Sequence, residues 1–189
     1  MKLTVEHLSL PKVGETKNGD AVLVRTDADG ASLVAVIDAL GHGELAAAAA
    51  DLAIASLERA PLDRGLRYVI DQLHVDLRGS RGAAAMLTLF RDGRFEGCGI
   101  GNVDLRSMKT RIPIVLSPGI LGASVSRIRV FDAQLTPGDR LLIFSDGISA
   151  RIDSESCRTG TPAEVCRAVM DRHRRTHDDA TILITDIEA

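Results

Sequence analysis

The sequence predicts an α+β protein whose strands pair mainly in antiparallel fashion. Two turn segments, Asp27 to Gly30 and Asp92-Gly93, have hairpin composition, and each lies between two apolar stretches of strand length. Three other stretches carry apolar residues at helical spacing. A chain of 189 residues can bury a substantial core. We therefore expect one domain that spans residues 1–189.

The composition is that of an ordinary soluble domain with an aliphatic core. Hydrophobic residues make up 45% and charged residues 26%, whereas aromatic residues make up only 3%. The formal net charge of −3 gives no reason to expect a nucleic acid or a membrane as partner. Neither a signal sequence nor an apolar run of membrane-spanning length is present in the sequence. We expect a cytoplasmic monomer.

The three cysteines do not form a recognisable framework. Cys98, Cys157 and Cys166 are odd in number and lack C-x-x-C spacing, so the sequence suggests neither a disulfide scaffold nor a zinc knuckle.

The N-terminal third predicts three strands and then two helices. Period-two alternation and turn residues bound the strands, and apolar stripes at helical spacing mark the helices. The strands are expected at Met1–Leu10, Ala21–Thr26 and Leu33–Ile37, and the helices at Glu44–Arg59 and from Pro61 to Leu77. Proline at position 61 suits the first turn of a helix.

The middle of the chain predicts sheet throughout. The expected strands are Ala84–Arg91, Arg94–Gly99, Val103–Met108, Arg111–Leu116 and Arg127–Leu135. The last two are separated by glycine-containing turns at Ser117 to Gly119 and at Gly122.

The C-terminal third begins with the apolar strand Arg140–Phe144, which ends in Ser145-Asp146-Gly147. Residues 148–160 show a weak, partly helical pattern. Thr161 to Glu164 is a capping box with proline at the first helical position, which predicts a helix to about His173. A last strand is expected at Ala180–Ile187, directly after Asp178 and Asp179.

Four acidic positions share one property, because each lies at an end of an apolar strand. Asp20 and the pair Asp178-Asp179 precede strands, whereas Asp38 and Asp146 follow them. In an antiparallel sheet, the starts and ends of neighbouring strands meet at the same edge. Aspartate is common in turns, which is the better explanation of any single position. The ordered set instead favours a metal centre.

Gathered carboxylates repel one another unless a cation neutralises them. Ligand sets made only of oxygen favour hard cations such as Mg²⁺ or Mn²⁺.

These positions fall within short motifs that resemble, in order, those of the metal-dependent PPM/PP2C protein phosphatases, and most closely the SpoIIE-type bacterial branch. The motifs are Gly19-Asp20, Asp38-Ala39-Leu40-Gly41-His42-Gly43, Gly99-Ile100-Gly101-Asn102, Ser145-Asp146-Gly147 and Asp178-Asp179-Ala180-Thr181. The likeness covers nearly the whole chain and is greatest to the stand-alone feedback phosphatases of the bacterial stressosome.

The resemblance implies a four-layer α-β-β-α sandwich with two Mn²⁺ or Mg²⁺ ions at one end. By matched position, Asp38 would bridge both ions and the carbonyl of Ala39 would bind one. Asp146 and Asp178 would hold the other, and Asp20 would act through water. The sequence does not separate Asp178 firmly from Asp179. Asp38 and Asp146 would be the catalytic residues, and a metal-activated water would attack phosphorus directly.

The chain departs from the family pattern after the first aspartate. Ala39 stands where the family usually has glycine, and a carbonyl ligand survives this change only if the local φ is allowed for a residue with a Cβ. His42 follows Asp38 by four residues, so the general-acid role known in the wider family is not transferred to it. We expect His42 to order the turn instead.

The resemblance predicts a phosphoserine/phosphothreonine protein phosphatase that acts on a phosphorylated STAS-domain protein of a stressosome or anti-anti-sigma module. One rival is a catalytically weak or dead relative used as a binding module, which Ala39 keeps open. The other is a metal-dependent hydrolase of small phosphoesters or nucleotides. The scarcity of aromatic residues for base stacking counts against nucleotides.

Overall fold

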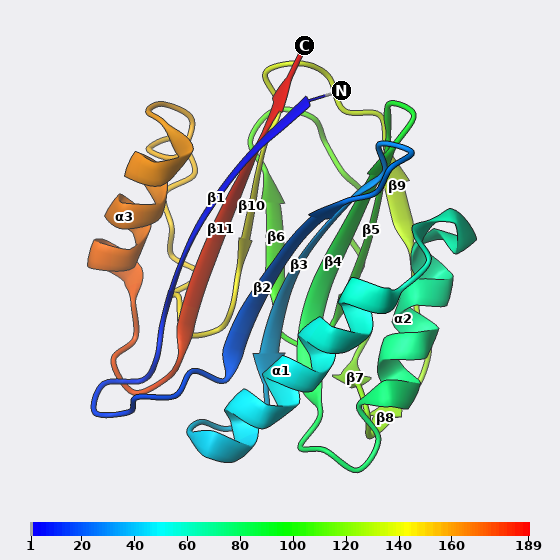
Figure 1. The fold of residues 1–189 in the computed structure, drawn as a ribbon. Helices are drawn as coiled ribbons and strands as arrows, with labels where there is room; N and C mark the ends of the chain where they lie inside the picture. Colours follow the sequence, from blue (N-terminus) through cyan, green and yellow to red (C-terminus); the bar gives the residue numbers. More distant parts are fainter. Residues whose placement is uncertain (1) are drawn as a thin grey trace.

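Two antiparallel sheets packed face to face form the centre of the computed structural model, which describes residues 2–189 (Figure 1). One sheet has the order β1-β11-β10-β6, with strands Lys2–Leu10, Ala180–Glu188, Arg140–Phe144 and Asp104–Ser107. The other has the order β2-β3-β4-β5-β9, with strands Asp20–Thr26, Ser32–Ala39, Ala83–Arg91, Arg94–Ile100 and Phe131–Ala133. A small hairpin pairs β7 (Gly119–Ile120) with β8 (Ser124–Val125). Met1, which belongs to the first expected strand, lies outside the described residues.

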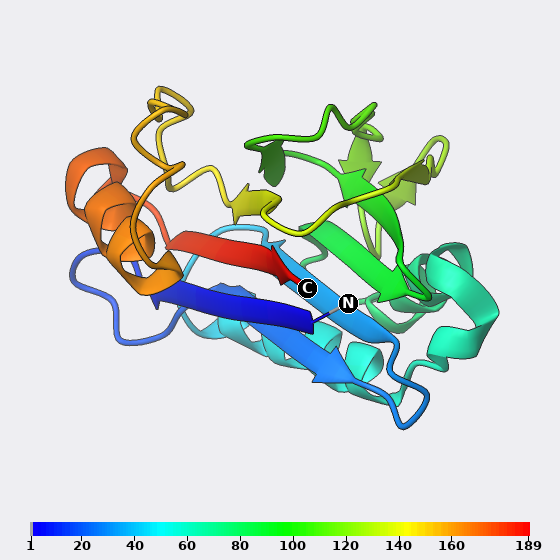
Figure 2. The ribbon, with the colours of Figure 1, turned by 90° about the horizontal axis from the view of Figure 1, so that it is seen from above.

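Helices cover the two outer faces of this pair of sheets. Helices α1 (Glu44–Arg59) and α2 (Gly65–Asp76) pack on the five-stranded sheet, and α3 (Pro162–His173) packs on the four-stranded one (Figures 1 and 2). The predicted four-layer α-β-β-α sandwich is therefore confirmed. Within residues 2–189, no helix is both long and apolar enough to cross a membrane.

Three apolar layers hold the four structural layers together, as strand alternation requires. In β3, Leu33 and Ile37 face the helices, whereas Val34 and Val36 face the opposite sheet. All four side chains are fully buried. A third apolar layer lies between the four-stranded sheet and α3.

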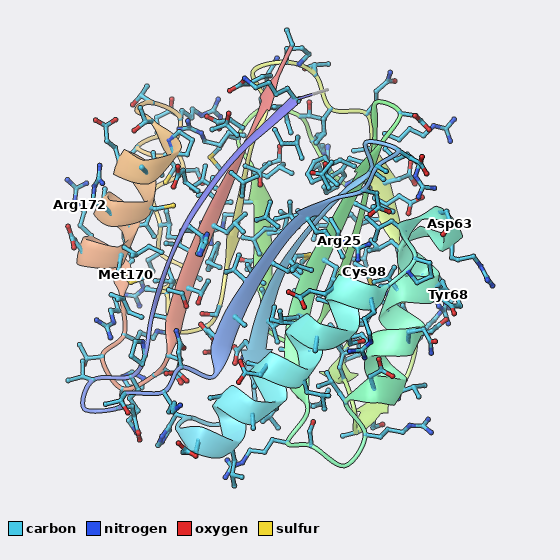
Figure 3. The ribbon with its side chains drawn as sticks, viewed as in Figure 1. Arg25, Asp63, Tyr68, Cys98, Met170 and Arg172 are labelled. Carbon is cyan, nitrogen blue, oxygen red and sulfur yellow. The ribbon has the colours of Figure 1, made fainter. Side chains whose placement is uncertain are left out.

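The sequence patterns of α1 and α3 explain how each helix packs. In α1 the buried face consists mainly of alanines, which lets the helix approach the sheet closely. In α3 the predicted capping box is present, since Thr161 Oγ1 accepts from Glu164 N and Glu164 Oε2 accepts from Thr161 N. Met170 of α3 is buried against the sheet and Arg172 is exposed (Figure 3).

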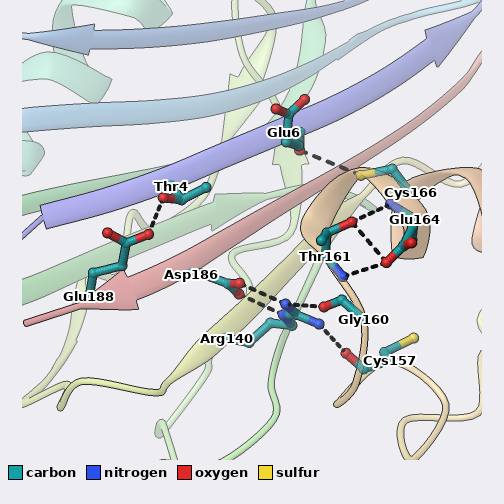
Figure 4. Close-up of polar contacts among 10 residues, drawn as sticks. All are labelled: Thr4, Glu6, Arg140, Cys157, Gly160, Thr161, Glu164, Cys166, Asp186 and Glu188. Carbon is teal, nitrogen blue, oxygen red and sulfur yellow. Dashed lines mark hydrogen bonds and ion pairs between the residues drawn. The ribbon is translucent and has the colours of Figure 1, made fainter.

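The prediction of partial helix at residues 148–160 is wrong, because two arginine side chains bind the carbonyls of this segment. Arg140 forms a two-pronged ion pair with Asp186 and donates to the carbonyl oxygens of Cys157 and Gly160, both at 2.9 Å (Figure 4). Arg106 donates to the carbonyls of two further residues, Ala150 and Ile152. These contacts hold the segment in an irregular path over the sheet.

Three other expectations need correction. Residues 111–116 form no strand, since Pro113 lacks an N–H and Ile112 and Ile114 pack into the core from an irregular backbone. Of residues 127–135, only Phe131–Ala133 pairs with the sheet. The expected second helix is divided into the short 3₁₀ turn Leu62–Arg64 and α2, because the φ of 79° at Gly65, where α2 begins, interrupts the helical backbone.

Candidate metal and catalytic site

The antiparallel register brings the predicted acidic positions to one end of the sandwich, the end at which α1 begins (Figure 1). Asp20 opens β2 and lies directly opposite Asp38, which is the penultimate residue of β3. In the other sheet, β10 pairs antiparallel with β11. Asp146, two residues after β10, and Asp178, two residues before β11, therefore lie at the same edge.

Three of the predicted carboxylates line one cavity of about 470 Å³, namely those of Asp38, Asp146 and Asp178. Lys12 and Asn102 also line it. Asp20 does not line it and is buried. The structure thus brings predicted residues of both sheets together around one opening, with the buried Asp20 paired to one of them, Asp38.

A hydrogen bond across the sandwich fixes Asp20. Ser145, which precedes Asp146, donates from Oγ to Asp20 Oδ2 at 2.6 Å, and Ser145 Oγ itself accepts from the amide of Thr181 at 2.9 Å. Burial raises the pKa of Asp20 to about 7, and the hydroxyl groups of Ser145 and Thr181 oppose this rise. One serine therefore joins the ends of β2, β10 and β11.

Asp38 carries the clearest sign of a missing partner. Its Oδ2 atom is buried and has no hydrogen-bond partner among the described residues. Burial raises the pKa of Asp38 to about 8, and the charges of Asp20, Asp146 and Asp178 add to the rise. A buried acceptor without a donor is costly, and a bound cation would satisfy it.

Asp146 is oriented from two sides. Asn102 donates from Nδ2 to Asp146 Oδ2 at 2.6 Å, and Arg175 donates to the Asp146 carbonyl at 3.0 Å. Burial and the charge of Asp178 raise the pKa of Asp146, whereas the hydrogen bond from Asn102 lowers it.

The structure separates the roles of the two adjacent aspartates that the sequence left open. Both carboxylate oxygens of Asp179 accept backbone N–H groups, Oδ1 from Lys12 at 2.7 Å and Oδ2 from Gly19 at 2.8 Å. Asp178 lines the cavity and accepts from the amide of Asp179. Asp178 is thus the member of the pair with an oxygen available for a ligand in the cavity.

The backbone at Ala39 tolerates its Cβ. Asp92 is the only non-glycine position with positive φ in the part of the chain that is described, so Ala39 lies outside the left-handed region. Ala39 donates its N–H to the Gly19 carbonyl at 3.0 Å. The departure from the family's glycine therefore costs no backbone strain.

His42 lies at the cavity rim with both ring nitrogens engaged. Nδ1 contacts Glu15 Oε1 at 3.0 Å and Nε2 contacts Lys12 Nζ at 2.8 Å. These contacts connect the β3–α1 turn to the β1–β2 connection, an arrangement that suits an ordering role.

Within residues 2–189, the structure contains no group of three or more His, Cys, Asp or Glu side chains that already surround a single metal position. The carboxylates instead border the cavity, with the unpartnered Asp38 oxygen among them. Burial is the largest cause of the raised pKa values at Asp20, Asp38 and Asp146, and neighbouring carboxylates add to each rise. This all-oxygen set fits a hard divalent cation.

Sequence reasoning missed several contributors to this site. The sequence allows Lys12 to contact a phosphate but favours a solvated loop there, and it suggests no role for Asn102 or Ser145, although both lie inside the motifs named above. The Gly-x-Gly-Asn pattern was a usable signal for Asn102. The placement of Lys12 left no local signal, because it results from hydrogen bonds to Asp179 and His42, which are remote in sequence.

No protein-family model matches the chain, and no curated protein matches it in sequence. Several solved structures do match the chain. One of them comes from work on the bacterial stressosome as a modular system that has been adapted to control secondary messenger signaling. It is 32% identical over 98% of this chain and 100% of that one, with a TM-score of 0.90.

Two further structures are more distant in sequence. RsbX in complex with magnesium is 21% identical over 97% of this chain and 94% of that one, with a TM-score of 0.83. The catalytic domain of the serine/threonine protein phosphatase PstP in complex with two manganese ions is 19% identical over 99% of both chains, with a TM-score of 0.76. At such identities these two establish a shared fold.

Proposed function

We propose that this chain, which shares its fold with PP2C-type phosphatases, is a metal-dependent phosphoserine/phosphothreonine protein phosphatase. One observation carries the proposal: Asp38, Asp146 and Asp178, from both sheets, line a single cavity in which a buried Asp38 oxygen lacks a partner. The fold neighbours that contain magnesium or manganese support a divalent ion as cofactor.

In this proposal Asp38, Asp146, Asp178 and the carbonyl of Ala39 would hold two Mn²⁺ or Mg²⁺ ions, and Asp20 would act through water. Such ions supply an activated water and neutralise charge on the phosphoryl group. Asn102 orients Asp146, and Ser145 orients Asp20, through the hydrogen bonds described above. The ammonium of Lys12 lines the same cavity and attracts a phosphoryl dianion to it.

The cysteines have no part in the proposed chemistry. All three are free and buried, and burial raises the pKa of both Cys98 (Figure 3) and Cys166 to about 12. A thiol that stays protonated is a poor nucleophile.

The substrate that we propose is a phosphorylated STAS-domain protein of a stressosome or anti-anti-sigma module. The 32% identical stressosome structure and the fold shared with RsbX support this choice, and they favour a stand-alone feedback phosphatase of the RsbX kind. We propose that it acts as a monomer in the cytoplasm.

The direct test is to incubate the protein with phosphorylated candidate STAS proteins and to follow loss of phosphate by mass spectrometry. Parallel reactions contain Mn²⁺ or a chelator, and a small aryl phosphate and a nucleotide serve as competing substrates. We expect Mn²⁺-dependent turnover that favours the phosphoprotein, because binding energy away from the phosphate contributes to catalysis.

Asp146→Asn tests the metal site in the same assay. This variant should lose most turnover at low Mn²⁺ and recover part of it at high Mn²⁺, since added Mn²⁺ restores occupancy of the weakened site by mass action. Undiminished turnover after exhaustive chelation would refute the metal mechanism. Equal efficiency on the aryl phosphate would refute the choice of a protein substrate.

A further inference from the structure

Asp179 is a buried carboxylate at the candidate site that does not line the cavity. Its side chain is only 3% exposed, and its two oxygens accept the backbone N–H groups of Lys12 and Gly19. These two amides lie at opposite ends of the β1–β2 connection. One carboxylate therefore holds both ends of the segment that leads into Asp20.

The bond from Gly19 has a consequence for Ala39. Gly19 and Ala39 continue the β2–β3 register beyond Asp20 and Asp38, and Ala39 N donates to the Gly19 carbonyl. In a regular antiparallel pair the Gly19 N–H would donate back to the Ala39 carbonyl. It donates to Asp179 Oδ2 instead, at 2.8 Å. The carbonyl of Ala39 is thereby left without its usual sheet donor.

Two glycines of the acidic motifs also pack against residue 179. A Cβ on Gly19 would lie 2.8 Å from Asp179 Oδ2 and 2.7 Å from Ala46 Cβ. A Cβ on Gly147 would collide with the carbonyl oxygen of Asp179. Gly19 of the Gly-Asp motif and Gly147 of the Asp-Gly motif therefore both pack tightly against Asp179.

The negative charge of Asp179 is unfavourable for its acidic neighbours, since it contributes to the raised pKa values of Asp20 and Asp38. A neutral asparagine would avoid that repulsion. Its amide group, however, has only one acceptor oxygen, so one of the two backbone donors would face another donor. The pair of N–H bonds explains why a carboxylate is needed here.

We propose that Asp179 is a positioning residue for the metal site: by taking the Gly19 N–H, it keeps the Ala39 carbonyl free to bind a metal ion. The same carboxylate holds Lys12 at the cavity. This inference rests on the proposed function, because it assigns a task only if metal ions bind at Asp38 and Ala39.

The test measures Mn²⁺ affinity by calorimetry for the wild type, Asp179→Asn and Asp179→Glu. Asparagine removes the charge, whereas glutamate keeps the charge but displaces it. We expect both variants to bind Mn²⁺ about 10–100-fold more weakly, the loss typical when a residue that orients a metal ligand is changed. If glutamate preserves the affinity that asparagine loses, the role is one of charge and the proposal is overturned. Wild-type affinity in both variants would overturn it too.

Asp139→Asn is the matched control. Asp139 is 1% exposed and likewise accepts two backbone amides, those of Thr110 and Thr136, but it precedes β10 at the opposite end of that strand from Asp146. This variant should lose stability and yet keep its Mn²⁺ affinity.

A second measurement covers the case in which the Asp179 variants do not fold. In the metal-free wild type, the amides of Lys12 and Gly19 should exchange slowly with solvent by nuclear magnetic resonance, and rapid exchange of both would overturn the proposal. A wild type that neither binds Mn²⁺ nor hydrolyses phosphoprotein would refute the proposed function itself. Mn²⁺-dependent turnover unchanged in the Asp179 variants would refute only this inference.

Discussion

Asp38→Asn should stabilise the protein in the absence of metal ions. In the presence of Mn²⁺, the same substitution should nearly abolish turnover. Burial and four neighbouring carboxylates raise the pKa of Asp38 from 3.8 to about 8, so ionising it in the folded protein is unfavourable. Asparagine has nearly the same shape without the charge. The same substitution removes a carboxylate that would hold the metal ions in the proposed function.

The size of the gain follows from that pKa. The interval from 3.8 to about 8 spans about four pH units, each worth about 1.4 kcal/mol, which sets an upper limit near 6 kcal/mol. Side-chain movement and water entry reduce this cost, so we expect a gain of about 2–3 kcal/mol above pH 8. For a protein of this length that gain corresponds to an increase in Tm of about 5–10 °C.

The gain depends on pH in a defined direction. Because the folded-state pKa of Asp38 lies above its unfolded value, both states hold the proton below about pH 4 and the variant has no advantage there. Its advantage grows as the pH rises from about 4 to about 8 and is constant above that range.

Thermal denaturation in chelator, followed by circular dichroism at about pH 5 and about pH 8.5, measures this difference. Turnover of a phosphoprotein with Mn²⁺ is measured in parallel. A variant that is less stable than the wild type at the higher pH, or equally stabilised at both, would refute the electrostatic reasoning. An active Asp38→Asn enzyme would refute the assignment of the site.

Three further predictions concern residues around the site. Replacement of Cys98, Cys157 and Cys166 together by serine should leave the folded fraction active, whereas a loss of kcat above about a hundredfold would indicate a thiol mechanism. His42→Ala should reduce kcat by less than the roughly 10²–10⁴-fold loss typical of a missing general acid, because both of its ring nitrogens serve to order the turn. Gly147→Ala should lower the free energy of unfolding by about 3 kcal/mol, measured by urea denaturation, since its Cβ would collide with the start of the last strand; an unchanged midpoint would contradict that packing.

Most of the regular elements could be predicted from local pattern. The bounds expected for α1 and β10 coincide with the observed ones, because apolar spacing and turn residues define them within the segment itself. The capping box likewise located the start of α3. The failures at residues 111–116 and 148–160 share a cause. The apolar residues of these segments mark single buried positions, such as Ile112 and Ile152. Regular structure depends instead on available backbone groups: Pro113 lacks an N–H, and Arg106 and Arg140 bind carbonyls between residues 150 and 160.

The sequence by itself determined which carboxylates stand at strand ends, and antiparallel pairing then requires Asp20 and Asp38 to meet. Only the tertiary structure decided which hydrogen-bond donors each carboxylate accepts there. Asp178 and Asp179 are adjacent and chemically identical. They differ in available acceptors, because both carboxylate oxygens of Asp179 accept backbone amides, those of Lys12 and Gly19. Those partners lie 167 and 160 residues away along the chain. Side-chain chemistry is a local property of the sequence, whereas the availability of an oxygen for a ligand depends on which distant backbone donors the fold brings to it.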